Sequence, residues 1–150
     1  MEVVKLNDFN YWDMIQKLSW YTLTQEVCNG KIKSHEAIEN CANILINEFE
    51  LTRTEIAEFN NFVVEKRRAL SKRLCEWIKE NDLSIMDLDD MWDLCAHIVG
   101  LGENMYYFVW DNPRIMYTIK KGLIGDENFE FIFDYGIHEL GINTTMMYDF

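Results

Sequence analysis

The chain has 150 residues, a length that fits one domain able to bury a sizeable core. Hydrophobic residues make up 49% and charged residues 27%, which excludes a disordered chain, and a single Pro excludes a collagen-like one. The formal net charge is −12 at pH 7, so the chain as a whole repels nucleic-acid phosphates. We therefore expect one acidic domain over residues 1–150.

Cysteine usage and the N-terminal sequence indicate the cellular compartment of the protein. The four cysteines, Cys28, Cys41, Cys75 and Cys95, are widely spaced and form no CxxC motif. No apolar signal core opens the sequence, and no apolar run reaches the length that spans a membrane. These features predict free thiols, no membrane association and a cytoplasmic location.

The dominant hydrophobic period is helical and predicts an all-α bundle of five to seven helices. The first helix should run from about residue 7 to a stop at Asn29 and Gly30. It carries apolar residues on two opposite faces, one of which is formed by Phe9, Trp12, Trp20 and Leu23. Such a helix either lies at the centre of a bundle or leaves one stripe for a partner.

A second helix is expected over residues 34–49 and a long central one over about 54–80. Thr52 and Glu55 have the spacing of a capping box at the start of the long helix. Its apolar residues fall within one arc up to Ile78, and that arc also contains Arg67. A charge there must be paired or reach outward along the surface.

The fourth helix is expected from about Ser84 to Gly100, with Leu88 in its apolar arc and His97 on the solvent side. Further helices are expected over 104–110 and 114–121. Residues 129–135 fit either a helix or a short β segment, because Phe129, Phe131 and Phe133 alternate.

Sequence motifs of enzymes are missing, since no G-x-S-x-G, Walker or G-x-G-x-x-G pattern occurs. Asp90, Asp93 and His97 follow the i, i+3, i+7 spacing of one helix face and are candidate ligands for Mn²⁺ or Mg²⁺. A metal-dependent enzyme is therefore one alternative. No completing ligand is evident, so we predict no cofactor.

Residues 66–80 carry six basic and two acidic side chains, in contrast to the acidic remainder. The run 51–58 resembles the opening of a helix-turn-helix, and a basic helix at 63–79 would then face DNA. That helix would use Lys66, Arg67, Arg68, Lys72 and Arg73. The required turn near Asn60 holds no Gly, however, and the net charge disfavours nucleic acid. A DNA-binding regulator is the second alternative.

Five aspartates, in contrast, crowd the start of the fourth predicted helix. Such an acidic face adds solubility or complements a strongly basic surface, including the nucleic-acid groove of an enzyme, where carboxylates would stand in for phosphates. The residues are Asp82, Asp87, Asp89, Asp90 and Asp93.

We therefore expect a protein-binding inhibitor or adaptor whose acidic face docks on a basic protein, with Trp12 or Trp20 as an apolar anchor. Phage-type anti-defence inhibitors and immunity proteins share this size and charge, which is an analogy of class only. A homodimer through the first or third helix is a further alternative.

Overall fold

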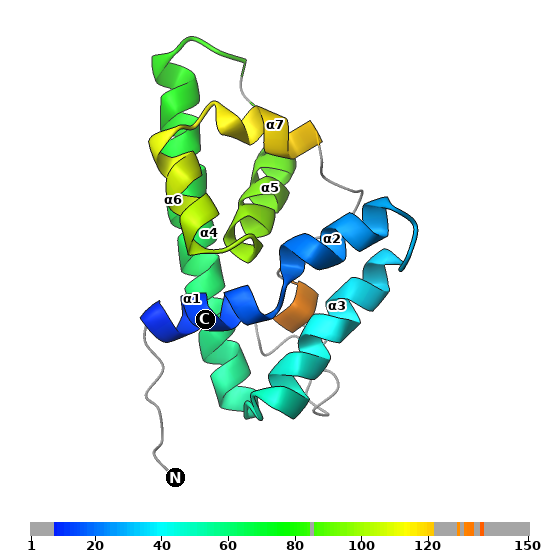
Figure 1. Ribbon diagram of the computed structural model, residues 1–150. Coiled ribbons are helices and arrows are strands. Elements are labelled where there is room, and N and C mark those ends of the chain that lie inside the picture. Colours follow the sequence, from blue (N-terminus) through cyan, green and yellow to red (C-terminus); the bar gives the residue numbers. More distant parts are fainter. Residues whose placement is uncertain (1–7, 85, 122–128, 130, 134–135, 137–150) are drawn as a thin grey trace.

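The computed structural model describes residues 8–84, 86–121, 129, 131–133 and 136 (Figure 1). Its elements are helical, which confirms the all-α prediction, and the described residues include no β-strand. Residues 131–133 are helical, so the short β segment considered for 129–135 is not found there. The helices are α1 Asp8–Lys17, α2 Trp20–Cys28, α3 Ser34–Asn43, α4 Arg53–Glu80, α5 Leu88–Gly100, α6 Glu103–Asp111 and α7 Ile115–Lys121, and a π-helical turn, Ile44–Glu48, continues α3.

Helix α4 is unbroken over 28 residues, about 42 Å at 1.5 Å per residue. Thr52 and Glu55 form the predicted capping box, because Thr52 Oγ1 accepts from the Glu55 N–H at 3.2 Å and Glu55 Oε1 accepts from the Thr52 N–H at 3.0 Å. Asn60 lies buried inside the helix rather than in a turn. The prediction of a long central helix is confirmed, and the turn near Asn60 that the helix-turn-helix alternative requires is not formed.

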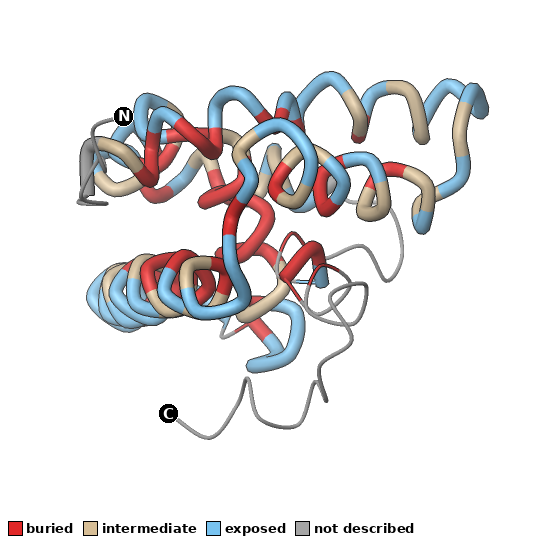
Figure 2. The backbone as a smooth tube through the Cα atoms, turned by 90° about the horizontal axis from the view of Figure 1, so that it is seen from below, coloured by how far each residue is buried: buried red, intermediate tan, exposed pale blue. Residues whose placement is uncertain are grey.

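The other helices are arranged around α4 (Figure 1). Helices α5 and α6 run along its C-terminal half, and α1 crosses its N-terminal half, where Tyr11 meets Phe59 and Phe62 at ring-centroid distances of 5.3 and 4.9 Å. Helices α2 and α3 form a hairpin beside this crossing. Buried stretches of the helices gather where the elements face one another (Figure 2).

The prediction of a single first helix is wrong, because this part of the chain forms two helices, α1 and α2. Ser19 adopts a left-handed conformation with φ 55°, and the chain changes direction between α1 and α2. The break allows Trp12 and Trp20, which a single helix would place on the same face, to be buried against different elements. Trp12 packs on Phe62 at 5.2 Å, whereas Trp20 packs on Phe129 at 5.4 Å between ring centroids.

Gly100, at the end of α5, allows the close approach of α2 to the core. A Cβ added there would lie 2.7 Å from Trp20 Cδ1 and 2.7 Å from the Phe129 ring. Both rings are fully buried and cannot give way easily. The absence of a side chain at Gly100 is therefore required by packing.

We predict that Gly100→Ala lowers the free energy of unfolding by about 1–3 kcal/mol, because the added methyl group overpacks the contact with Trp20 and Phe129. Urea unfolding followed by circular dichroism measures the change. Gly136→Ala is the matched control, since a Cβ there meets no atom closer than 3.6 Å. Equal stability of the Gly100→Ala and Gly136→Ala proteins would contradict the packing requirement.

One buried hydrogen bond ties α2 to α5. The Trp20 indole N–H donates to His97 Nδ1 at 3.1 Å, and His97 is buried rather than solvated as the sequence pattern predicted. Burial lowers the pKa of His97 to about 4, so the ring is neutral in the folded protein at neutral pH.

The low pKa of His97 predicts acid destabilisation, because the unfolded chain binds a proton near pH 6.5 whereas the folded protein does not until about pH 4. Stability is unaffected above pH 6.5 and falls by up to ~1.4 kcal/mol per pH unit below it. His97→Gln keeps an acceptor for Trp20 but does not titrate. The stability advantage of the wild type over His97→Gln should shrink by about 2.5 kcal/mol between pH 7 and pH 4.5. Parallel stability curves of the two proteins would refute this linkage.

Candidate functional site

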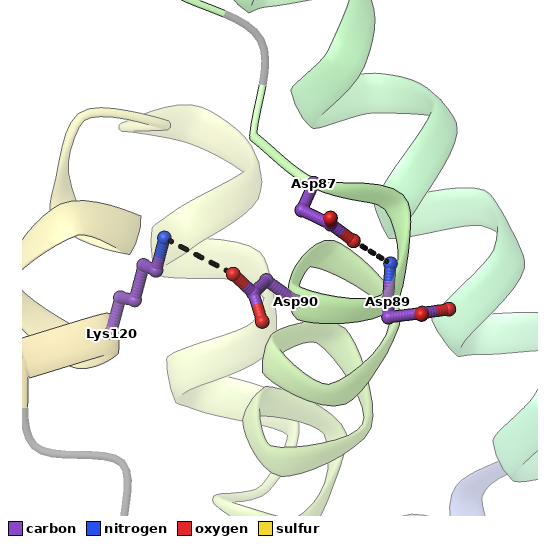
Figure 3. Close-up of polar contacts among 4 residues, drawn as sticks. All are labelled: Asp87, Asp89, Asp90 and Lys120. Carbon is purple, nitrogen blue, oxygen red and sulfur yellow. Dashed lines mark hydrogen bonds and ion pairs between the residues drawn. The ribbon is translucent and has the colours of Figure 1, made fainter.

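The corner between α4 and α5 carries most of the predicted acidic face. Asp82, Asp87, Asp89 and Asp90 are all exposed there, and Leu83 and Leu88 are exposed beside them. These six residues are named the corner surface below. It places negative charge and exposed apolar side chains around the turn between the two helices, with the Asp89 and Asp90 carboxylates on opposite sides of α5 (Figure 3).

The backbone of the corner is set by the end of α4 and the start of α5. The Asn81 side-chain amide donates to the Trp77 carbonyl at 2.8 Å and closes α4, and Asp82 then adopts a left-handed φ of 52°. Asp87 is the N-cap of α5, its Oδ1 accepting from the Asp89 N–H at 2.8 Å (Figure 3). The positive end of the α5 dipole favours the carboxylates in its first turn, so the crowding of like charges is partly offset.

Asp90 extends the corner surface toward α7. Its Oδ2 lies 3.8 Å from Lys120 Nζ, and the two side chains are 58% and 41% exposed (Figure 3). An ion pair this exposed contributes little to stability. Asp90 is therefore free to change partners in a complex without a large structural cost.

Leu88 is the residue that sequence reasoning missed. The helical period placed it in the core arc, but it is 75% exposed, and Leu83 is 37% exposed. The difference is that α5 begins at Leu88 rather than near Ser84, so this residue lies in the first turn of the helix and not within its packed length. The signal was present in the sequence, since Asp87 is as good an N-cap as Ser84.

Asp93 and His97, which the helical period placed on the same side as the aspartates, are less exposed than predicted. Asp93 is half-buried, and His97 is buried with its Nδ1 bonded to Trp20. Across the described ranges, no three His, Cys, Asp or Glu side chains come together as metal ligands. The set of Asp90, Asp93 and His97 considered for Mn²⁺ or Mg²⁺ is therefore not assembled.

The prediction that Trp12 or Trp20 anchors a partner also needs correction. Trp12 and Trp20 are 5% and 1% exposed, so neither can meet a partner, and Leu23 is half-buried. The side chain of Phe9 lies outside the described residues. Trp12 and Trp20 do not share one surface, because the chain changes direction at Ser19 and the two rings pack on Phe62 and Phe129 respectively.

Three of the five basic residues predicted to face DNA are engaged within the fold. Arg67 is buried, with its guanidinium carbon 3.3 Å from the centroid of the Trp92 ring. Arg73 Nε donates to the Trp110 carbonyl at 3.2 Å. The Lys66 ammonium lies 5.4 Å from the Phe62 ring centroid, which is cation–π distance.

Arg68 and Lys72 remain exposed on α4. Two exposed cations on an unbroken helix do not form the recognition helix considered for residues 63–79. A recognition helix follows a turn, which lets it project from the core into the major groove. The structure thus removes the geometric basis of the DNA-binding alternative.

Two of the four free thiols are shielded from chemistry. Burial raises the pKa of Cys41 to about 12, and it raises the pKa of Cys95 as well. A nucleophilic cysteine requires the thiolate form, which these environments suppress.

Comparison with protein families, curated proteins and solved structures found no match to this chain. In the part of the chain that the structure describes, none of the helices combines the length and apolar character needed to cross a membrane.

Proposed function

We propose that this chain is a small protein-binding module, an inhibitor or adaptor that docks through the corner surface on a basic surface of a partner protein. The observation that carries the proposal is the 75% exposure of Leu88 among four exposed aspartates. Contiguous exposed apolar surface rimmed by polar groups marks interaction sites, and we take Leu88 and Leu83 as the apolar part of such a surface.

The electrostatics support the same partner class. A net charge of −12 and a local excess of carboxylates attract a cationic surface and speed encounter with it. Leu88 and Leu83 would then supply apolar contact once the charges have aligned the two proteins. Charge steers the approach, and leucine burial slows dissociation.

The basic partner surface we favour is one that binds nucleic acid, because carboxylates held in a first helical turn can occupy sites built for phosphates. An anti-defence inhibitor of a nucleic-acid-acting complex and an immunity protein are two forms this function takes. We assign the activity to the cytoplasm, since all four cysteines are unpaired thiols.

We predict that the immobilised chain retains a basic protein from extracts of the cells that produce it, and that replacing the four corner aspartates by Asn abolishes retention. Asn at position 87 keeps the N-cap, so the fold should survive. The control removes four other exposed or half-exposed charges by Glu→Gln changes at Glu39, Glu48, Glu58 and Glu76. A protein retained equally by both variants is not docked on the corner surface.

With the retained partner purified, the association rate should fall about tenfold between low salt and physiological salt, because counterions screen the steering charges. Leu88→Ser should leave that rate nearly unchanged and raise the dissociation rate about tenfold or more, since a buried leucine stabilises by ~1.5–3 kcal/mol. Stopped-flow mixing or surface plasmon resonance measures both rates. An association rate insensitive to salt would refute the steering role of the aspartates.

A further inference from the structure

A hollow of about 390 Å³ lies among α2, α5, α7 and the start of α6, away from the corner surface. Its volume is within the range of about 300–1,000 Å³ that is typical of small-molecule sites. His97, which lines it, is nine residues along α5 from Leu88, about 14 Å at 1.5 Å per residue. The lining residues are Tyr21, Thr24, Gln25, His97, Leu101, Asn104, Met105, Thr118 and Ile119.

The lining selects for an uncharged ligand. Leu101, Met105 and Ile119 provide apolar surface, and the 60% exposed ring of Tyr21 stands at the rim. None of the lining residues carries a charge at neutral pH, because burial holds the pKa of His97 at about 4. A charged ligand group would lose its hydration without gaining an ionic partner.

Two polar side chains, each more than nine-tenths buried, give the hollow its hydrogen-bonding pattern. His97 Nδ1 accepts from the Trp20 indole, so the proton of the neutral ring is on Nε2, which is a donor. The Thr24 hydroxyl donates to the Tyr21 carbonyl at 2.8 Å, so its oxygen keeps lone pairs that can accept. Because both residues line the hollow, we take His97 Nε2 as its donor and Thr24 Oγ1 as its acceptor, beside an apolar wall.

We propose that this hollow binds a small uncharged ring compound that bears a carboxamide. The carbonyl oxygen of the amide accepts from His97 Nε2–H, the amide N–H donates to Thr24 Oγ1, and the ring lies against Leu101, Met105 and Ile119. Benzamide is the simplest molecule with these features. The proposal does not depend on the docking function of the corner surface.

The test is a titration of the full chain with benzamide, followed by ¹H–¹⁵N NMR of the Trp20 indole and ¹H–¹³C NMR of the Met105 methyl group. The indole resonance is informative because its proton is bonded to His97. We expect saturable shifts at both groups with a Kd in the millimolar range, as suits a molecule of this size. Benzoate has the same shape but a negative charge, and we expect it to bind about tenfold more weakly or not at all.

A pair of variants tests the location. Thr118→Phe places a ring at the exposed rim of the hollow and should weaken benzamide binding about fivefold or more. Thr54→Phe introduces the same change at an exposed position in the first turn of α4 and should have no effect. The proposal is overturned by the absence of saturable shifts, by equal binding of benzoate, or by equal binding to both variants. The comparison of benzamide with benzoate decides the matter even if a variant fails to fold.

Discussion

The burial of one long face of α4 is the constraint on which the rest of the structure depends. Its capped start at Thr52 and its uninterrupted course to Glu80 provide a surface along which α1, α5 and α6 pack. Most of that face is aliphatic or aromatic, and the one cation within it, Arg67, is stacked on Trp92 of α5. The stack combines a planar guanidinium with an aromatic face, which suits arginine better than lysine.

The same packing explains why function is assigned to a corner rather than to a helix face. The inward sides of α4 and α5 pack against each other. Three cations of α4, Lys66, Arg67 and Arg73, are engaged by aromatic rings or by the Trp110 carbonyl. The segment that joins α4 to α5 lies outside the contact between the two helices. Its aspartates are held by an N-cap and a helix dipole, and Leu88 and Leu83 are 75% and 37% exposed.

The opposite end of α5 has a different chemistry. There Gly100 admits Trp20 to the core, Trp20 fixes the tautomer of His97, and His97 lines an uncharged hollow. One helix thus carries exposed negative charge at its N-terminus and a buried neutral donor near its C-terminus. The two proposals rest on these two ends and can succeed or fail separately.

Some expectations were met because they depend on local chemistry alone. The helical period and the Thr52–Glu55 capping box involve residues within a few positions of one another, so the all-α class and the span of α4 follow from the sequence. The clustering of aspartates at one helix start is likewise a local fact, and the structure leaves four of them exposed.

Contacts between distant segments decided the rest. A helix over 7–29 satisfies local propensity, but burying both Trp12 and Trp20 requires a left-handed residue at Ser19, which only the surrounding helices impose. Leu88 has the period of a core residue, yet it lies in the first turn of α5 and is 75% exposed. His97 follows a polar pattern, yet a partner 77 residues away buries it. Periodicity states which residues share a face, whereas burial depends on what is packed against that face, and tertiary structure alone determines this.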